Sequence, residues 1–221
     1  MKEFAYLCRA MGLQNLSDIH THHIGHQGAL LSLPPVLAMQ GCATPYSIQL
    51  HPWYLTESPN STYEKEDIAT FLEAIEHCQE DPNLMAIGEC GLDNVCGVPL
   101  DIQLQAFQIA LKTARERGLP VIIHCVGYWT EMMACVKEYY SLPMGKECGG
   151  AIIHGFRKGP QLAQQLLREG FSISLGEKFN PEVARLLPEE RLYIETDESN
   201  TDICLIREKI LSLRKSNNTE Q

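Results

Sequence analysis

Pro120-Val-Ile-Ile-His124 is a short apolar run, rich in β-branched residues, that ends in a histidine, and Gly150-Ala-Ile-Ile-His154 repeats the pattern further along the chain. Runs of this length and composition, bounded by turn residues, are typical of buried strands. Similar runs extend outward from this pair in both directions. The expected strands are residues 16–20, 29–33, 46–50, 84–89, 121–124, 151–154, 171–175 and 192–196.

Helical patterns fill several of the gaps between these runs, which indicates a parallel α/β fold. The expected helices are residues 63–78, 101–117, 130–140, 160–169 and 203–213. Eight such strands favour a TIM-type (β/α)8 barrel over an open doubly wound sheet, because no glycine-rich phosphate fingerprint follows the first strand.

The connection between the first two strands is too short for a regular barrel. Only residues 23–28 separate them, and a crossover that contains a helix needs about ten residues or more. We therefore expect a distorted barrel that lacks the first crossover helix. Residues 2–13 are amphipathic and are expected to form a helix that covers the apolar face left exposed. The whole chain, 1–221, is read as one domain, with an N-terminal extension at 1–15 and a frayed tail at 216–221.

Composition limits the classes of partner. Acidic residues outnumber basic ones by 28 to 18, giving a net charge of −10, and no stretch forms a basic stripe. Contact with nucleic acid should therefore be local, although metal ions in a pocket would still admit a phosphate-bearing substrate. Nine scattered cysteines without a Cys-x-x-Cys pair indicate reduced thiols, and we see no secretory or membrane-spanning segment. A cytoplasmic protein is expected, with no membrane contact and no evident obligate protein partner.

Histidines and acids gather at the ends of the expected strands. In Asp18-Ile-His20-Thr-His22, alternation by two lets both imidazoles reach one cation, although polar residues at a strand end can also be ordinary caps. Glu89, His124, His154 and Asp197 likewise end strands or follow them. Because the carboxyl ends of barrel strands converge on one face, these side chains should meet in one cup.

The number and type of these side chains indicate metal binding. Six candidate ligands exceed what one hydrolytic cation usually takes from protein, so two ions bridged by Glu89 are more economical than one ion with spare histidines. Imidazole and carboxylate without thiolate suit zinc, manganese or magnesium. Such a pair activates water for hydrolysis of an ester or phosphoester.

The sequence resembles the TatD-type metal-dependent hydrolases over roughly residues 17–199. The motifs that carry the resemblance are Asp18-x-His20-x-His22, His51-Pro-Trp53, Ile87-Gly-Glu-Cys-Gly-Leu-Asp93, Pro120-Val-Ile-Ile-His124, His154-Gly-Phe156 with Gly159, and Ile194-Glu-Thr-Asp197. Together, and in this order, they are highly specific.

The resemblance implies a division of roles. His20 and His22 would hold one ion with Asp197, His124 and His154 would hold the other, and Glu89 would bridge. Asp197 would also take the proton of the attacking water, and His51 would contact the substrate or its phosphate. The catalytic residues would thus be Asp197, Glu89 and His51. In this family the activity is often that of a deoxyribonuclease, so DNA or another phosphate ester is the expected partner at the barrel mouth.

The chain also departs from the family pattern. Val126 stands where the family usually has an arginine, and residues 196–199, Thr-Asp-Glu-Ser, lack the usual proline. Arg157 and Lys158 could replace the missing phosphate clamp, or they could belong to a solvated loop. Asp93 could orient a ligand, meet substrate or cap its loop, and Trp53 could stack on a base or pack under its loop.

Three functions remain open from the sequence. The leading one is a two-metal phosphodiesterase of the deoxyribonuclease type. The second is a small-molecule phosphatase or amide or ester hydrolase that uses the same cup. The third, suggested by Val126 and the altered Thr-Asp-Glu-Ser loop, is a metal-binding barrel without turnover.

Overall fold

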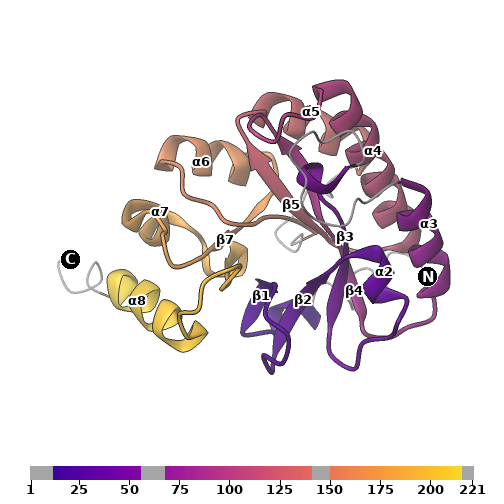
Figure 1. Cartoon of the computed structure of the whole chain (residues 1–221). Helices are drawn as coiled ribbons and strands as arrows, with labels where there is room; N and C mark the ends of the chain where they lie inside the picture. Colours follow the sequence, from indigo (N-terminus) through magenta and orange to yellow (C-terminus); the bar gives the residue numbers. More distant parts are fainter. Residues whose placement is uncertain (1–11, 56–67, 141–149, 216–221) are drawn as a thin grey trace.

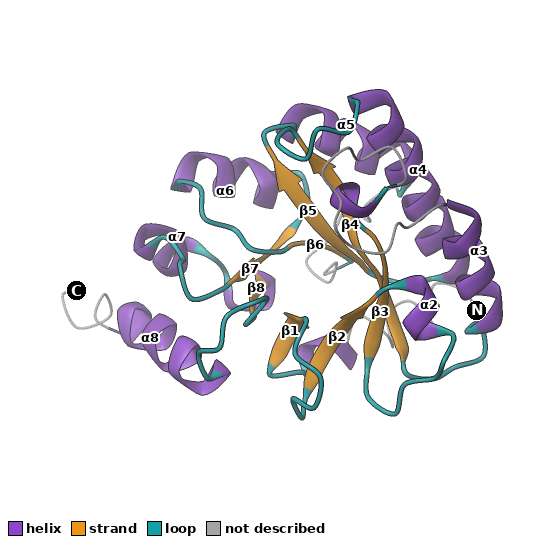
Figure 2. Ribbon diagram, in the orientation of Figure 1, coloured by secondary structure: helices purple, strands orange, loops and turns teal. Residues whose placement is uncertain are grey.

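The computed structural model describes residues 12–55, 68–140 and 150–215. Its strands form one parallel sheet in sequential order, and the helices lie on the outer side of the strands (Figures 1 and 2). The strands are β1 Asp18–Thr21, β2 Ala29–Leu33, β3 Tyr46–Leu50, β4 Leu84–Asp93, β5 Val121–Val126, β6 Ala151–Ile153, β7 Ser172–Leu175 and β8 Leu192–Ile194. This arrangement confirms the expected eight-stranded barrel.

The helices follow the strands in alternation. They are α2 Pro35–Ala38, α3 Ile68–His77, α4 Leu100–Arg117, α5 Trp129–Tyr139, α6 Pro160–Arg168, α7 Pro181–Leu186 and α8 Ile203–Lys215, with short 3-10 helices η1 Pro52–Tyr54 and η2 Glu189–Arg191. The part of the expected helix 63–78 before residue 68 and the tail from 216 lie outside the described residues. Sequence analysis missed α2 and α7, because elements of four and six residues are too short to display helical periodicity.

The first crossover has no helix. Within the described stretch 12–55, residues 22–28 connect β1 to β2 as a loop. This confirms the expectation that so short a connection cannot leave the sheet, form a helix and return.

Two apolar layers hold the barrel together. The larger one lies between the sheet and the helices and includes Ile48, Phe107 and Val136. The smaller one fills the inside of the barrel. Its members come mostly from one position on each of several strands and are Leu13, Ile19, Leu30, Ala86, Ile122, Ile152 and Tyr193.

Leu13 shows where the N-terminal extension enters the fold. Most of the expected helix 2–13 lies outside the described residues, but residues 12–14 are helical. The Leu13 side chain is fully buried and packs in the inner layer of the barrel. The described end of the extension therefore closes the amino end of the barrel, where an apolar side chain excludes water from the inner layer.

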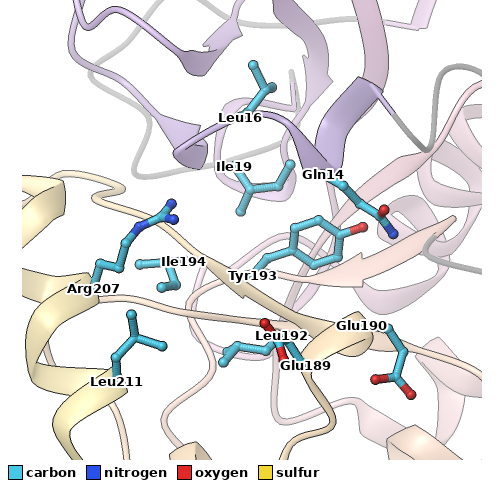
Figure 3. Close-up of a pocket in the computed structure, with 10 residues that line it drawn as sticks. All are labelled: Gln14, Leu16, Ile19, Glu189, Glu190, Leu192, Tyr193, Ile194, Arg207 and Leu211. Carbon is cyan, nitrogen blue, oxygen red and sulfur yellow. The ribbon is translucent and has the colours of Figure 1, made fainter.

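The barrel closes incompletely between β8 and β1. An isolated bridge pairs Thr21, the last residue of β1, with Asp197 after β8, and the Asp197 amide donates to the His20 carbonyl at 2.9 Å. Below this bridge a cavity of about 550 Å³ opens between β1, β8 and α8. Figure 3 shows the Tyr193 ring in its centre, with Arg207 entering from α8. The Arg207 guanidinium donates to the Ser17 carbonyl at 2.9 Å and so spans the seam.

Strand β4 carries an irregularity that matters for the site. Its register against both neighbouring strands shifts between Ile87 and Cys90, so Gly88 and Glu89 lie in a bulge. Bulges of this kind re-aim side chains next to functional sites. After the bulge β4 stays paired with β5 as far as Asp93, which is why both strands are longer than expected.

Gly91→Ala is expected to destabilise the protein by about 3 kcal/mol or more. Gly91 has a φ of 149°, and a Cβ at this position would overlap the backbone carbonyl oxygen of His124, which cannot move without breaking the β4–β5 pairing. Urea denaturation of the wild type and the variant would measure the loss. Gly41→Ala is the control, because Gly41 has a φ of 87° with open space around it and should lose only about 1 kcal/mol. Equal losses in the two variants would contradict the argument.

Candidate metal centre

Glu89 lies at the centre of the cup, only 4% exposed. Its Oε1 is 2.8 Å from His124 Nδ1 and 2.7 Å from His154 Nε2. Its Oε2 is 3.2 Å from His20 Nε2 and 3.4 Å from His22 Nε2. The two carboxylate oxygens thus face two different pairs of histidines, one pair from β5 and the loop after β6, the other from β1 and the residue that follows it.

Asp197 lies near His20 and His22, the pair of histidines from β1 and the residue after it. Its Oδ1 is 3.8 Å from the Nε2 atoms of both His20 and His22. The backbone at Asp197 has a φ of 56°, in the left-handed region that Asp and Asn adopt more readily than most residues. The bridge to Thr21 holds this conformation and so fixes the carboxylate at the rim.

His51 approaches the same carboxylate, although sequence analysis placed it outside the set of six. Its Nε2 is 3.1 Å from Glu89 Oε1. Its Nδ1 accepts a hydrogen bond from the Trp53 backbone amide at 3.2 Å. The ring is also packed edge-on against His124, with 4.5 Å between ring centroids. The structure thereby brings the six ligand candidates and His51 together.

The electrostatics of the cup centre on the buried negative charge. Burial disfavours the Glu89 carboxylate, but His154, His51 and His124 outweigh burial and hold its pKa well below the ordinary value. Burial also lowers the pKa of His154, yet the Glu89 and Glu195 carboxylates raise it well above the ordinary value. For His51 burial dominates and its pKa is lowered.

The side chains present fit divalent cations. Within the described residues, three groups of nitrogen and carboxylate atoms lie close enough to share an ion: His20, His154 and Asp197; His20, His22 and Glu89; and His51, Glu89 and His124. Both ring nitrogens of His20 are buried and make no hydrogen bond in the described part of the chain. Leaving such nitrogens unpaired is costly, and a cation would satisfy one of them.

Asp93 is held by protein contacts. It is 3% exposed, and its Oδ2 lies 2.8 Å from both His124 Nε2 and Trp53 Nε1. Burial disfavours the Asp93 carboxylate, but these hydrogen bonds outweigh burial and lower its pKa to about 2. Of the roles expected for Asp93, these contacts match the orientation of a ligand.

Arg157 and Lys158 line a cavity of about 290 Å³ that also contacts His124, His154 and Asp197. Val126 and Trp129 form another part of its wall. Arg157 also borders a neighbouring cavity of about 300 Å³, which includes Lys178 and Ser199. Both basic residues therefore border the cup, as a phosphate contact requires. Sequence analysis missed Trp129 and Lys178, which no strand-end pattern marks.

Two further buried acids support the cup. Glu195 is fully buried, accepts a hydrogen bond from the Gly155 amide and has its Oε1 3.6 Å from His154 Nδ1. It lies within the expected strand 192–196, two residues before Asp197, and an acid at this spacing from a ligand candidate is a signal that would have identified it. Asp18 accepts a hydrogen bond from the Thr196 hydroxyl at 2.6 Å, so it joins β1 to the segment that follows β8.

No helix in the described ranges is long and apolar enough to cross a membrane. The cytoplasmic location expected from the cysteines stays a prediction.

Comparison with solved structures supports the fold. The YjjV TatD homolog from Escherichia coli K12 aligns with a TM-score of 0.58 at 20% identity, over 97% of this chain and 89% of that one. A TatD family hydrolase from Entamoeba histolytica aligns with a TM-score of 0.58 at 19% identity, over 88% of this chain and 64% of that one.

Sequence comparison supplies the family. The metal-dependent hydrolase YabD of Bacillus subtilis is 31% identical over 153 residues, covering 66% of this chain and 56% of that protein. A protein named 3'-5' ssDNA/RNA exonuclease TatD, from a Rahnella species, is 34% identical over 125 residues, covering 52% of this chain and 46% of that protein. The chain thus spans about half the length of these relatives. The model of the family described as TatD related DNase matches residues 42–200, and the chain therefore belongs to this family.

Proposed function

We propose that this protein is a hydrolase that uses two divalent cations bridged by Glu89. The observation that carries the proposal is the division of the Glu89 oxygens, Oε1 toward His124 and His154 and Oε2 toward His20 and His22. Asp197 completes the second set at 3.8 Å. One carboxylate between two sets of donors is the arrangement that a two-ion site requires.

The donors limit the identity of the ions. Imidazoles and carboxylates without a thiolate suit zinc, manganese and magnesium. When bound, such ions lower the pKa of water toward neutrality and stabilise negative charge on the substrate oxygen.

In this proposal Asp197 is the general base. Its side chain is 24% exposed, whereas that of Glu89 is only 6% exposed, and it borders both cavities of the cup. A carboxylate at this boundary can accept a proton from water inside the cup while its backbone stays fixed by the bridge to β1. Glu89, in contrast, is enclosed by imidazoles and serves to hold charge.

The substrate class that we infer is a phosphodiester of single-stranded nucleic acid. Support comes from relatives named as ssDNA/RNA exonucleases and from Arg157 and Lys158 at the rim of the cup. The net charge of −10 agrees with recognition of a short end of the strand rather than a long tract. The small size of the two cavities, about 290 and 300 Å³, also suits a phosphate monoester, which is the second candidate.

Metal analysis combined with a substrate panel tests the proposal. The full chain, loaded with Zn²⁺ or Mn²⁺ and freed of excess metal, should contain two ions per molecule by elemental analysis. It should then shorten a labelled single-stranded DNA in a metal-dependent way and act less on small phosphate monoesters. Two bound ions with activity confined to monoesters would favour the second candidate. Two bound ions without turnover on either class would indicate a metal-binding barrel.

His51→Ala is expected to weaken substrate turnover without changing the metal content. The His51 Nδ1 accepts the Trp53 amide hydrogen, so the neutral ring carries its own hydrogen on Nε2 and can donate it to an oxygen in the cup. Loss of one such donor costs about a hundredfold in rate. His77→Ala, on the outer helix α3, is the control and should leave both quantities unchanged. Loss of an ion from the His51 variant would instead make His51 a ligand.

A further inference from the structure

A buried hydrogen-bond network connects the loop after β3 to His124. Asp93, at the end of β4, is its centre. The Asp93 Oδ2 accepts from Trp53 Nε1 and from His124 Nε2, each at 2.8 Å, and its Oδ1 accepts from the Val95 amide at 2.6 Å. Both carboxylate oxygens are therefore occupied by donors from the protein.

Helix α4 fixes Asp93 in this position. The Gln103 side chain is 1% exposed, and its Oε1 accepts the Asp93 amide hydrogen at 2.7 Å. Its Nε2 lies 2.9 Å from the Asp93 carbonyl and 2.7 Å from that of Val98. A buried amide satisfied on both sides holds the backbone of this turn rigidly, so the Asp93 carboxylate has little freedom to turn toward the cup.

This network determines which nitrogen of His124 can bind an ion. A carboxylate accepts hydrogen bonds only, so the hydrogen of a neutral His124 ring must lie on Nε2, facing Asp93. The lone pair is then on Nδ1, which lies 2.8 Å from Glu89 Oε1 and 3.3 Å from His154 Nε2. These three atoms are the donors of one half of the proposed centre.

Trp53 connects this hydrogen-bond network to a second ring, that of His51. Its indole N–H is bound by Asp93, and its backbone N–H is bound by His51 Nδ1. For a neutral His51 the hydrogen therefore lies on Nε2, facing Glu89. The network thus turns the lone pair of a neutral His124 and the N–H of a neutral His51 into the cup.

We propose that Asp93 is a positioning residue that fixes the tautomer and orientation of His124, so that Nδ1 is the ligating atom. The inference rests on the proposed metal centre. It moves Asp93 from a substrate contact to a residue that acts through His124. Carboxylates that hold ligating histidines in this way typically strengthen metal affinity ten- to a hundredfold.

Asp93→Asn provides the sharpest change. An amide has one acceptor oxygen and one NH₂ group, so it cannot serve both Val95 on one side and the pair Trp53 and His124 on the other. We expect calorimetric titration of the metal-free full chain with Zn²⁺ to show one ion bound ten- to a hundredfold more weakly, and the other unchanged. Long-range ¹H–¹⁵N spectra of the zinc-loaded protein should show hydrogen on His124 Nε2 in the wild type and a changed ring in the variant.

Two control variants separate positioning from general damage. Asp101→Asn makes the same chemical change on the exposed first turn of α4 and should leave both ions bound as in the wild type. Trp53→Phe keeps the ring and the backbone amide but removes the indole N–H, so zinc affinity should stay within about threefold of the wild type, because His124 still donates to Asp93. Circular dichroism must show the same fold in each variant.

The outcomes distinguish this inference from the proposed function. If the wild type binds two zinc ions and Asp93→Asn binds both with the affinities of the wild type, the positioning role is wrong while the metal centre stands. The same holds if His124 of the zinc-loaded wild type carries its hydrogen on Nδ1. If the wild type binds fewer than two ions, the proposed centre itself fails and this inference fails with it.

Discussion

Asp197→Asn is expected to lower the turnover of a phosphodiester substrate about a hundredfold or more, the usual contribution of a positioned general base. The amide keeps the size of the side chain and one acceptor oxygen but cannot take a proton from water. The backbone should not change, because Asn tolerates the φ of 56° that this position adopts. Steady-state rates on labelled single-stranded DNA, measured with elemental analysis of the same sample, would show the effect.

A carboxylate-to-amide change on the surface of α8 serves as the control. Glu208→Gln lies on the exposed side of α8 and should keep wild-type turnover and metal content. If Asp197→Asn retains both ions and nearly the original rate, Asp197 is not the base. If it loses an ion, the fall in rate reports ligation as well, and activity must be compared per fully loaded molecule.

Glu89→Gln should have the largest effect on metal content. Both oxygens of Glu89 face imidazoles within 3.4 Å, and the neutral amide offers one weak acceptor in place of two charged ones. We expect the variant to bind one ion or none and to lose activity at least a hundredfold. Glu76→Gln is the control, because its surface ion pair with Arg117 is 68% exposed on the Glu side. Full loading of Glu89→Gln with two ions would contradict the bridge.

The departures from the family pattern meet at one cavity. Val126, in the place of the usual arginine, lines the same 290 Å³ space as Arg157 and Lys158. This proximity supports the prediction that the two basic residues replace the missing phosphate clamp. Val126 and Trp129 make the neighbouring wall apolar, which suits contact with the flat face of a base.

The sequence by itself determined the strands, the missing first crossover helix and the convergence of the ligand candidates. Alternation by two and β-branched composition are local properties, and they locate a strand end to within a few residues. Because all strands run parallel, knowing which residues end them was enough to gather His20, Glu89, His124 and Asp197 at one rim. The short loop after His22 excluded a helix by length alone.

Only the tertiary structure decided which atoms face one another. The bulge at Gly88 and Glu89 sets the direction of the bridging carboxylate, and it depends on pairing with both neighbouring strands, which a local pattern does not contain. The contacts of Asp93 with His124 and Trp53 likewise join segments that are distant in the chain. Hydrogen-bond direction is a property of pairs of groups in space, so roles such as ligand, donor and positioning residue emerge only once the strands are in register.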